Sequence, residues 1–310
     1  MVSTPRETVV ISGGTGSAKF LRGLQRLGHF TVVANVGDNC WFHGLYVCPD
    51  VDIVMYTLAG VADYKRGWGI QGDEFKALAV LKRLGAPGTW FNIGDMDLAT
   101  DVFRTSLMKD GMTLTEITAK VARGLGVRER VLPATDQHVE TRIETEESGE
   151  MHLQEFWVKE GGQLTPKSVR YVGARQAKPT KEVARSLSAA GRVIIAPANP
   201  ITSILPTLSI GGMKQAISKS RARKVAISPM VGSRAYSGPA TKMMEACGLK
   251  ASSEGLADIY KGLIDVLIID ESDRSLVGPI ETRGISCITA PTLMRTVEDA
   301  QRLAKLAMDA

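Results

Sequence analysis

The most specific local pattern in the sequence is a glycine-rich turn that follows a short apolar segment. Val9-Val10-Ile11 is an apolar run that ends at Ser12, Gly13-Gly14-Thr15-Gly16-Ser17-Ala18-Lys19 comes next, and an amphipathic stretch follows from Phe20. A strand that leads through such a turn into a helix presents backbone N–H groups and the positive end of the helix dipole to an anion. A turn that needs glycine only for its backbone angles is the alternative. The residues expected to bind phosphate are Gly13, Gly14, Thr15, Gly16 and Lys19.

Two better-known phosphate-binding patterns do not fit this turn. Lys19 stands where the dinucleotide-binding fingerprint has its third glycine, and the second predicted strand ends in Asn35 instead of an acidic residue that would bind ribose. No Gly-Lys-Ser/Thr follows at the spacing of a Walker A loop. The sequence therefore disfavours an NAD-dependent enzyme and a P-loop nucleotidase.

Acidic side chains form the second pattern, in the segment Cys48-Pro49-Asp50-Val51-Asp52. In an extended chain Asp50 and Asp52 point to the same side, and proteins usually hold Mg²⁺ by one or two carboxylates together with substrate phosphate oxygens. A turn or helix-capping role is an equal alternative for Asp52. Asp63 is a further candidate ligand, because residues 62–69 combine glycines and cations in a way typical of a mobile substrate loop.

Aromatic residues are the third pattern. Three of the four tryptophans, Trp41, Trp68 and Trp90, fall in the first third of the chain. Trp41 and Trp68 lie in segments rich in glycine and polar residues, where an aromatic side chain is as well suited to a flat ligand ring as to core packing.

Two loops in the C-terminal half leave apolar segments through proline and small polar residues, at 196–203 and 228–233. In open parallel sheets, ligands bind beyond the carboxyl ends of the strands, so both loops are candidates for one crevice with the glycine turn. Loops without any ligand remain the alternative.

The elements that would position these residues alternate along the chain as strand and helix. The predicted strands are Thr8–Ser12, Thr31–Asn35, Thr89–Ile93, Val193–Pro197, Val225–Ser228, Asp265–Asp270 and Ile285–Ala290. This pattern predicts an α/β fold of the Rossmann-like, doubly wound kind, with a mostly parallel sheet.

Two insertions interrupt the alternation. Helical periodicity at 74–84, 98–108 and 114–125 predicts a small helical subdomain, and apolar alternation on both sides of an acidic turn predicts a β-hairpin within 139–158. We expect residues 1–70 and 128–310 to form the Rossmann-like core and residues 71–127 the helical subdomain.

Composition narrows the class of protein. The 310 residues are 44% hydrophobic, carry a formal net charge of +5 and include four scattered cysteines without C-x-x-C spacing, which disfavours a disulfide scaffold or structural zinc. Neither a long apolar segment nor a secretory leader is evident. We expect a cytoplasmic protein that binds neither nucleic acid nor membrane, and a homodimer on general frequency.

Several motifs together carry a family resemblance that none carries alone. They are Gly13-Gly14-Thr15-Gly16 with Lys19-Phe20-Leu21, Asn35-Val36-Gly37-Asp38, Gly44-Leu45 before Pro49-Asp50-Val51-Asp52, Gly94-Asp95-Met96-Asp97-Leu98-Ala99-Thr100, Ala196-Pro197-Ala198-Asn199-Pro200, and Ser228-Pro229 before Gly238-Pro239-Ala240. In this order they resemble the 2-phospho-L-lactate transferase family of deazaflavin coenzyme biosynthesis. Asn39 is a departure, because a second acidic residue often follows Asp38 in that family.

The resemblance implies a Mg²⁺-dependent transferase of a substituted phosphate group. The donor would be lactyl- or enolpyruvyl-diphosphoguanosine, the acceptor the ribityl hydroxyl of 7,8-didemethyl-8-hydroxy-5-deazariboflavin, and GMP the leaving group. By analogy Asp50 holds Mg²⁺ close to the attacking hydroxyl, and Asp63 is a second metal ligand. The glycine turn faces phosphate; Asn199, Ser203 and Ser233 face the guanosine; and Trp68, Thr89 and Trp90 border the deazaflavin.

A non-enzymatic alternative shares part of the pattern. The glycine turn and the Asn-x-Gly-Asp segment also resemble those of regulators of the gluconeogenesis-factor type. Such regulators are expected to bind nucleotide sugars without transfer chemistry. The tryptophans, together with Asp50 and Asp63, favour the transferase, because such a regulator needs neither a metal ion nor a flat acceptor.

Overall fold

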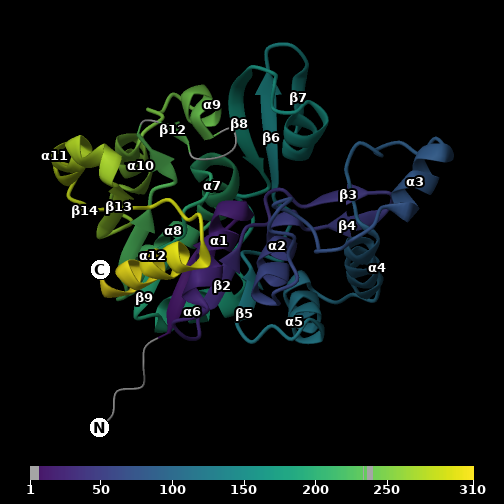
Figure 1. Cartoon of the computed structure of the whole chain (residues 1–310), viewed down its shortest axis with the longest axis horizontal. Helices are drawn as coiled ribbons and strands as arrows, with labels where there is room; N and C mark the ends of the chain where they lie inside the picture. Colours follow the sequence, from purple (N-terminus) through teal and green to yellow (C-terminus); the bar gives the residue numbers. More distant parts are fainter. Residues whose placement is uncertain (1–6, 233, 236–239) are drawn as a thin grey trace, which may run out of the picture.

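The computed structural model describes residues 7–232, 234–235 and 240–310. Its centre is a seven-stranded sheet in the order β14-β13-β10-β9-β1-β2-β5, with all neighbouring strands parallel (Figure 1). The strands are β1 (Thr8–Ser12), β2 (Thr31–Ala34), β5 (Arg130–Pro133), β9 (Arg192–Ile195), β10 (Arg223–Ile227), β13 (Val266–Asp270) and β14 (Ser286–Ala290). The expected α/β fold with a mostly parallel sheet is confirmed.

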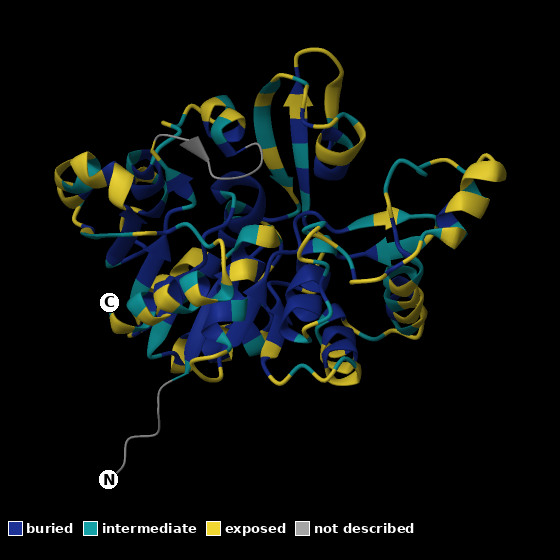
Figure 2. Cartoon of the chain, viewed as in Figure 1, coloured by how far each residue is buried: buried dark blue, intermediate teal, exposed yellow. Residues whose placement is uncertain are grey.

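The central strands form because their residues are buried on both faces of the sheet. All five residues of β1 and all five of β13 are buried, and both strands are rich in valine and isoleucine. Such continuous apolar runs are typical of parallel sheets that carry helices on both sides. Figure 2 shows this buried centre beneath partly exposed helices.

The helices cover both faces because the connection from β1 leads to β2 on one side, whereas the connection from β9 leads to β10 on the other side. Helix α1 (Gly14–Leu24) contacts α2 (Pro49–Leu58) and α12 (Val297–Asp309), in front of the sheet in Figure 1. Helix α6 (Lys181–Ala189) contacts α8 (Met213–Lys219). Right-handed crossovers toward β2 on one side and toward β10 on the other place these two groups on opposite faces.

The first insertion follows β2. It comprises the hairpin β3 (Cys40–Phe42) and β4 (Leu45–Val47), then α3 (Lys76–Arg83), α4 (Asp95–Lys109) and α5 (Leu114–Gly124). The three predicted helices are present; α3 and α4 lie at one end of the molecule, whereas α5 packs against β5 (Figure 1). The division into domains at residues 70 and 128 stays a prediction.

The second insertion is a three-stranded antiparallel sheet of β7 (Gly149–His152), β6 (Glu140–Thr145) and β8 (Pro166–Val172). The predicted hairpin corresponds to β6 and β7. Its second arm was predicted too long, because Phe156 and Val158 lie in a π-helix over Glu155–Lys159, where the Phe156 ring is fully buried.

One predicted strand is wrong, and one strand of the seven-stranded sheet was not predicted. Residues 89–93 form a turn and an irregular segment in which Trp90 and Phe91 pack on Phe42, at 5.1 and 4.3 Å between ring centroids. An apolar run without a neighbouring strand has no ladder to join. The strand that pairs with β2 is instead β5.

The remaining elements surround the carboxyl ends of the sheet. They are a π-helix (Pro200–Ile204), α7 (Leu205–Ser209), β11 (Met230–Val231), β12 (Arg234–Ala235), α9 (Ala240–Ala246), α10 (Ser253–Tyr260), a 3-10 helix (Glu271–Leu276) and α11 (Val277–Glu281). Within the described part of the chain, no helix combines the length and apolar character needed to span a membrane.

Candidate functional site

The glycine turn lies at the point of the sheet where the direction in which successive strands are added reverses. Strand β1 has β2 on one side and β9 on the other, so the connections that leave β1 and β9 diverge at their carboxyl ends. Crevices in open α/β sheets form at such a switch point. Helix α1 begins there at Gly14, with Gly13 in extended conformation as the residue before it.

Gly13 and Gly14 are required for different reasons, a close approach of neighbouring atoms at Gly13 and a positive φ at Gly14. A Cβ atom on Gly13 would lie 2.6 Å from the Ser203 carbonyl oxygen and 2.7 Å from Asp50 Oδ2. Gly14 has a φ of +68°, which L side chains rarely adopt. The turn therefore brings Asp50 and Ser203, two of the residues singled out from the sequence, against the start of α1.

Asp50 is a buried carboxylate at the N-terminus of α1. Its Oδ2 accepts a hydrogen bond of 2.9 Å from Asn35 Nδ2, at the carboxyl end of β2. Burial raises the pKa of Asp50 to about 6, against the opposing effects of the Asn35 and Gly14 N–H donors. A buried acid whose pKa lies near neutrality is typical of a functional group.

The segment that carries Asp50 is helical, which corrects the expectation of an extended chain. Pro49 occupies the first turn of α2, and Asp50 and Asp52 follow in the same turn. Proline fits that position because its missing N–H would have no intrahelical partner, and acidic residues there complement the helix dipole. Asp50 and Asp52 therefore have different environments.

Asp52 forms a buried ion pair with Arg104 of α4. The same guanidinium contacts Asp101 Oδ1 at 2.6 Å and the Tyr46 carbonyl oxygen at 3.1 Å. Arg104 thus ties α2 and the β3–β4 hairpin to α4. Among the alternatives left open for Asp52, this contact supports a structural role.

A second buried carboxylate, Asp38, lies near Asp50. Burial, followed by the charge of Asp50, raises the pKa of Asp38 well above its ordinary value. Gln154 Nε2 donates to Asp38 Oδ2 at 3.2 Å, whereas Oδ1 is buried without a hydrogen-bond partner. Asp38 is part of the motif Asn35-Val36-Gly37-Asp38 named from the sequence, but it was not among the predicted metal ligands, because Asn39 stands where the resembled family often has a second acidic residue.

These two acids fit a divalent cation that is completed by substrate. No group of three or more acidic, histidine or cysteine side chains in the described residues is arranged as a ready metal site. A buried oxygen without a partner and mutual repulsion between Asp38 and Asp50 are conditions that a cation relieves. Mg²⁺ commonly takes one or two carboxylates, with phosphate oxygens and water as its other ligands.

Asp63 lies in the loop after α2 and has partners of its own. Its Oδ1 accepts the N–H groups of Lys65 and Arg66, and its Oδ2 lies 3.0 Å from Arg66 Nη2. These contacts, the Arg66 N–H first, lower the pKa of Asp63. Its role as a metal ligand stays a prediction.

A first cavity lies at the glycine turn. It is lined by Thr15, Gly16, Lys19, Pro197, Ser228, Pro229, Val231, Thr292, Leu293 and Met294. Three residues of the predicted phosphate site, Thr15, Gly16 and Lys19, are therefore brought together with the loops after β9, β10 and β14. The enclosed space is about 40 Å³, so a nucleotide would extend across its mouth.

The side chains expected near guanosine lie at different places. Asn199 Oδ1 caps the following π-helix by accepting the N–H groups of Ile201 and Thr202. Ser203 packs against Gly13 and Gly14. Ser233 lies outside the described residues. Neither Asn199 nor Ser203 is among the described residues that line the first cavity.

A second cavity, of about 270 Å³, lies beside Asp38. It is lined by Asn39, Cys40, Trp41, Phe42, Tyr46, Trp90, His138, Glu140, His152 and Glu155. Trp90 is thus placed at a cavity wall as expected, and Trp41 joins it. Trp68 packs instead against Phe75 and beneath Arg66, at 6.1 and 4.8 Å, and Thr89 precedes Trp90 without lining the cavity.

Asp38 and Asp50 each adjoin residues of a different cavity. Asp50 touches Gly13 and Gly14, whose neighbours Thr15 and Gly16 line the first cavity, and Asp38 precedes Asn39, which lines the second. One cavity carries the N-terminal residues of α1, which suit an anionic group, and the other carries aromatic side chains, which suit a flat ring.

Comparison with solved structures supports the fold. A member of the UPF0052 family from Bacillus halodurans superposes with a TM-score of 0.67 at 19% identity, and the match covers 98% of this chain and 100% of the other.

Comparison with curated proteins gives closer relatives. The 2-phospho-L-lactate transferases of Methanosarcina mazei and Methanopyrus kandleri are 37% and 41% identical, covering 97% and 96% of this chain and 99% and 94% of their own. A phosphoenolpyruvate transferase of Streptomyces griseus is 35% identical, covering 97% of each chain. The profile described as "2-phospho-L-lactate transferase CofD" matches residues 8–283. The chain therefore belongs to the 2-phospho-L-lactate transferase CofD family and is a transferase.

Proposed function

We propose that the protein moves a phospholactyl or phosphoenolpyruvyl group from a guanosine diphosphate-activated donor to the ribityl hydroxyl of 7,8-didemethyl-8-hydroxy-5-deazariboflavin, releasing GMP. The observation that carries this proposal is the buried pair Asp38 and Asp50, because Asp50 touches the glycine turn of the first cavity and Asp38 precedes a residue that lines the aromatic cavity. A regulator that only binds a nucleotide sugar would need no such aromatic cavity. The reaction would take place in the cytoplasm.

The chain's own residues would position two substrates. Thr15, Gly16 and Lys19 would hold the donor diphosphate in the first cavity, where the α1 dipole favours negative charge. Trp41 and Trp90 would border the deazaflavin in the second. The contacts that the family resemblance implies also remain part of the proposal, although neither cavity assignment depends on them. They are Trp68 and Thr89 for the deazaflavin, and Asn199, Ser203 and Ser233 for the guanosine. Phosphoryl transfer depends mostly on such positioning and on charge neutralisation.

In the transfer itself, the ribityl oxygen attacks the phosphorus that bears the lactyl or enolpyruvyl group, and the bond from that phosphorus to the GMP oxygen breaks. The hydroxyl proton leaves as the new P–O bond forms, and Asp50 is the carboxylate proposed to receive it. A pKa of about 6 leaves Asp50 mostly ionised near neutral pH and able to accept a proton. Mg²⁺, when bound, would neutralise charge on the diphosphate.

Asp50 is the proposed metal ligand, and Asp38 fits the second position better than Asp63. Asp38 Oδ1 is buried without a partner, whereas both oxygens of Asp63 accept hydrogen bonds. We expect Asp38→Asn to weaken Mg²⁺ binding in the presence of GDP at least about tenfold, ~1.4 kcal/mol, and Asp63→Asn to change it little. Isothermal titration calorimetry measures the Mg²⁺ affinity of both variants. A larger loss in Asp63→Asn than in Asp38→Asn would support Asp63 as the second metal ligand.

The pKa of Asp50 predicts how Mg²⁺ affects stability. Its folded-state pKa of about 6 lies above the ordinary value of 3.8, so its protonation favours the folded state below about pH 4, and this contribution is lost as pH rises through about 6. We expect Mg²⁺ to raise Tm more near about pH 7.5 than near about pH 5, because it binds the ionised carboxylate. An equal shift at both pH values, by scanning calorimetry, would contradict the assignment.

Deazaflavin binding should quench tryptophan fluorescence. Trp41 and Trp90 line the second cavity, whereas Trp157 lies on the π-helix over Glu155–Lys159 and is 43% exposed. We expect Trp90→Phe to remove a substantial part of the quenching and the matched change Trp157→Phe to preserve it. Unchanged quenching in Trp90→Phe would place the ring elsewhere.

We also propose a homodimer, on the general frequency of two-fold assemblies among soluble proteins. Sedimentation equilibrium should then give twice the chain mass of 33.4 kDa. A concentration-independent mass of one chain would contradict it.

A further inference from the structure

Two aspartates at the carboxyl end of β13 lie close to the first cavity without lining it. Asp270 is the last residue of β13, and Asp273 follows in the 3-10 helix. Both are buried, at 8% and 5% exposure. Neither takes part in an ion pair among the described residues. Their hydrogen bonds lead instead to two walls of the cavity.

Asp270 holds the wall that follows β14. Its Oδ2 accepts both the N–H and the hydroxyl of Thr292, each at 3.0 Å, and Thr292 lines the cavity. Its Oδ1 accepts the N–H and the hydroxyl of Ser272, at 3.0 and 2.7 Å. Burial alone would raise the pKa of Asp270, but these four donors outweigh it and lower the pKa. The carboxylate is therefore ionised and fully bonded.

Asp273 holds the opposite wall through two serines. Ser253 Oγ, at the start of α10, lies 3.2 Å from Asp273 Oδ2 and 2.9 Å from Ser228 Oγ. Ser228 lines the cavity and accepts the Met230 N–H at 3.0 Å. All three members of the chain are buried, at 5% exposure or less.

The direction of this chain follows from its end. A carboxylate can only accept, so Ser253 uses its one hydroxyl hydrogen on Asp273 and must accept the hydrogen of Ser228. Ser228 in turn accepts the Met230 N–H, which holds the turn Ser228–Val231 in one conformation. Both hydroxyl hydrogens of this chain find an acceptor only when an accepting oxygen stands at position 273.

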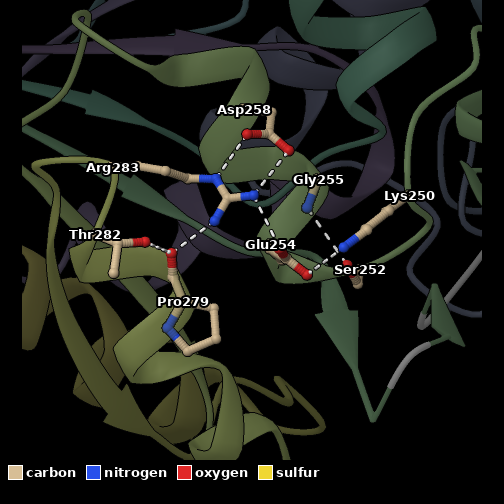
Figure 3. Close-up of polar contacts among 8 residues, drawn as sticks. All are labelled: Lys250, Ser252, Glu254, Gly255, Asp258, Pro279, Thr282 and Arg283. Atoms are coloured by element: carbon tan, nitrogen blue, oxygen red, sulfur yellow. Dashed lines mark hydrogen bonds and ion pairs between the residues drawn. The ribbon is translucent and has the colours of Figure 1, made fainter.

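Helix α10 is also held from outside (Figure 3). Arg283 donates from Nε and Nη2 to the two oxygens of Asp258, at 2.6 and 3.2 Å. It also donates to Glu254 at 2.8 Å and to the Pro279 carbonyl oxygen at 2.6 Å. The start of α10, which carries Ser253, is thus fixed relative to α11 and β14.

We propose that Asp270 and Asp273 are positioning residues that hold two wall segments of the donor cavity, Thr292–Met294 and Ser228–Val231, in the conformation that binds the donor nucleotide. This inference rests on the proposed function, which assigns the first cavity to the donor. The two aspartates act through Thr292 and Ser228 and do not touch the substrate themselves.

The test measures binding of GDP with Mg²⁺ by isothermal titration calorimetry. We expect Ser253→Ala to weaken GDP binding about tenfold, because Asp273 and Ser228 both lose their partner, and Asp270→Asn to do the same, because an amide nitrogen cannot accept the bonds of Ser272 or Thr292. The KM of the donor should rise in both variants while the KM of the deazaflavin stays unchanged.

A double-mutant cycle shows whether Ser253 acts through Ser228. In the Ser228→Ala background, Ser253→Ala should cause no further loss of GDP affinity, since the link between them is already broken. Asp273→Asn, which retains one accepting oxygen, should bind GDP close to the wild-type level.

Thr180→Ala is the matched control for stability. It removes the hydroxyl that caps α6 and should lower Tm comparably, with unchanged GDP affinity. Wild-type GDP affinity in Ser253→Ala or Asp270→Asn, or additive losses in the cycle, would overturn the inference. Failure of the wild-type protein itself to bind GDP would overturn the donor assignment of the cavity, and this inference with it.

Discussion

Replacing Asp50 by asparagine should lower the rate of transfer at least about tenfold, equivalent to ~1.4 kcal/mol in the barrier. The substitution keeps the size of the side chain and its place against Gly13 and Gly14. It removes the charge that would hold Mg²⁺ and replaces the basic carboxylate, proposed to receive the hydroxyl proton, by an amide that cannot accept it. Steady-state kinetics at saturating Mg²⁺ and both substrates measure the effect.

The control for this prediction is the same change at a carboxylate far from the cavities. Asp110 follows α4 and is exposed, so Asp110→Asn should leave the rate unchanged. Because burial raises the pKa of Asp50, Asp50→Asn should also retain or increase stability near neutral pH. A turnover close to that of the wild type would remove Asp50 from the mechanism.

Replacing Arg104 by methionine should have the largest effect on stability, a loss of about 3–5 kcal/mol. The guanidinium is 1% exposed and contacts both Asp52 and Asp101. Its removal leaves two buried carboxylates without a cation. The loss should be smaller at low pH, where these carboxyls can be protonated, and should grow as pH rises.

Urea denaturation of Arg104→Met at several pH values tests this prediction. Arg26 pairs with Glu298 on the surface, where both side chains are largely exposed, so Arg26→Met should cost less than about 1 kcal/mol. Similar losses for the two variants would show that the Asp52–Arg104–Asp101 group does not stabilise the junction of α2 and α4.

The parallel sheet could be predicted because its strands are continuous apolar runs. Six of the seven predicted strands coincide with strands of the sheet, within a few residues at each end. The segment 89–93 looked similar, but its aromatic side chains pack on Phe42 rather than in a sheet. The hydrophobic pattern of a segment indicates that its side chains are buried, but it does not indicate which part of the protein they pack against.

The candidate site could be predicted only in part, for a related reason. The glycine turn and Asp50 have local signals, and the structure brings them together. Asp38 gains its significance from a neighbour 12 residues away and Asp52 from Arg104, 52 residues away. Such pairings arise when helices and strands pack, so no spacing in the sequence reveals them.

The most direct test of the account is to incubate the protein with the deazaflavin, the guanosine diphosphate-activated donor and Mg²⁺, and to detect products by mass spectrometry. The account predicts equal amounts of GMP and of a phosphodiester that joins the deazaflavin to the lactyl or enolpyruvyl group. Unchanged deazaflavin, with or without hydrolysis of the donor, would contradict it.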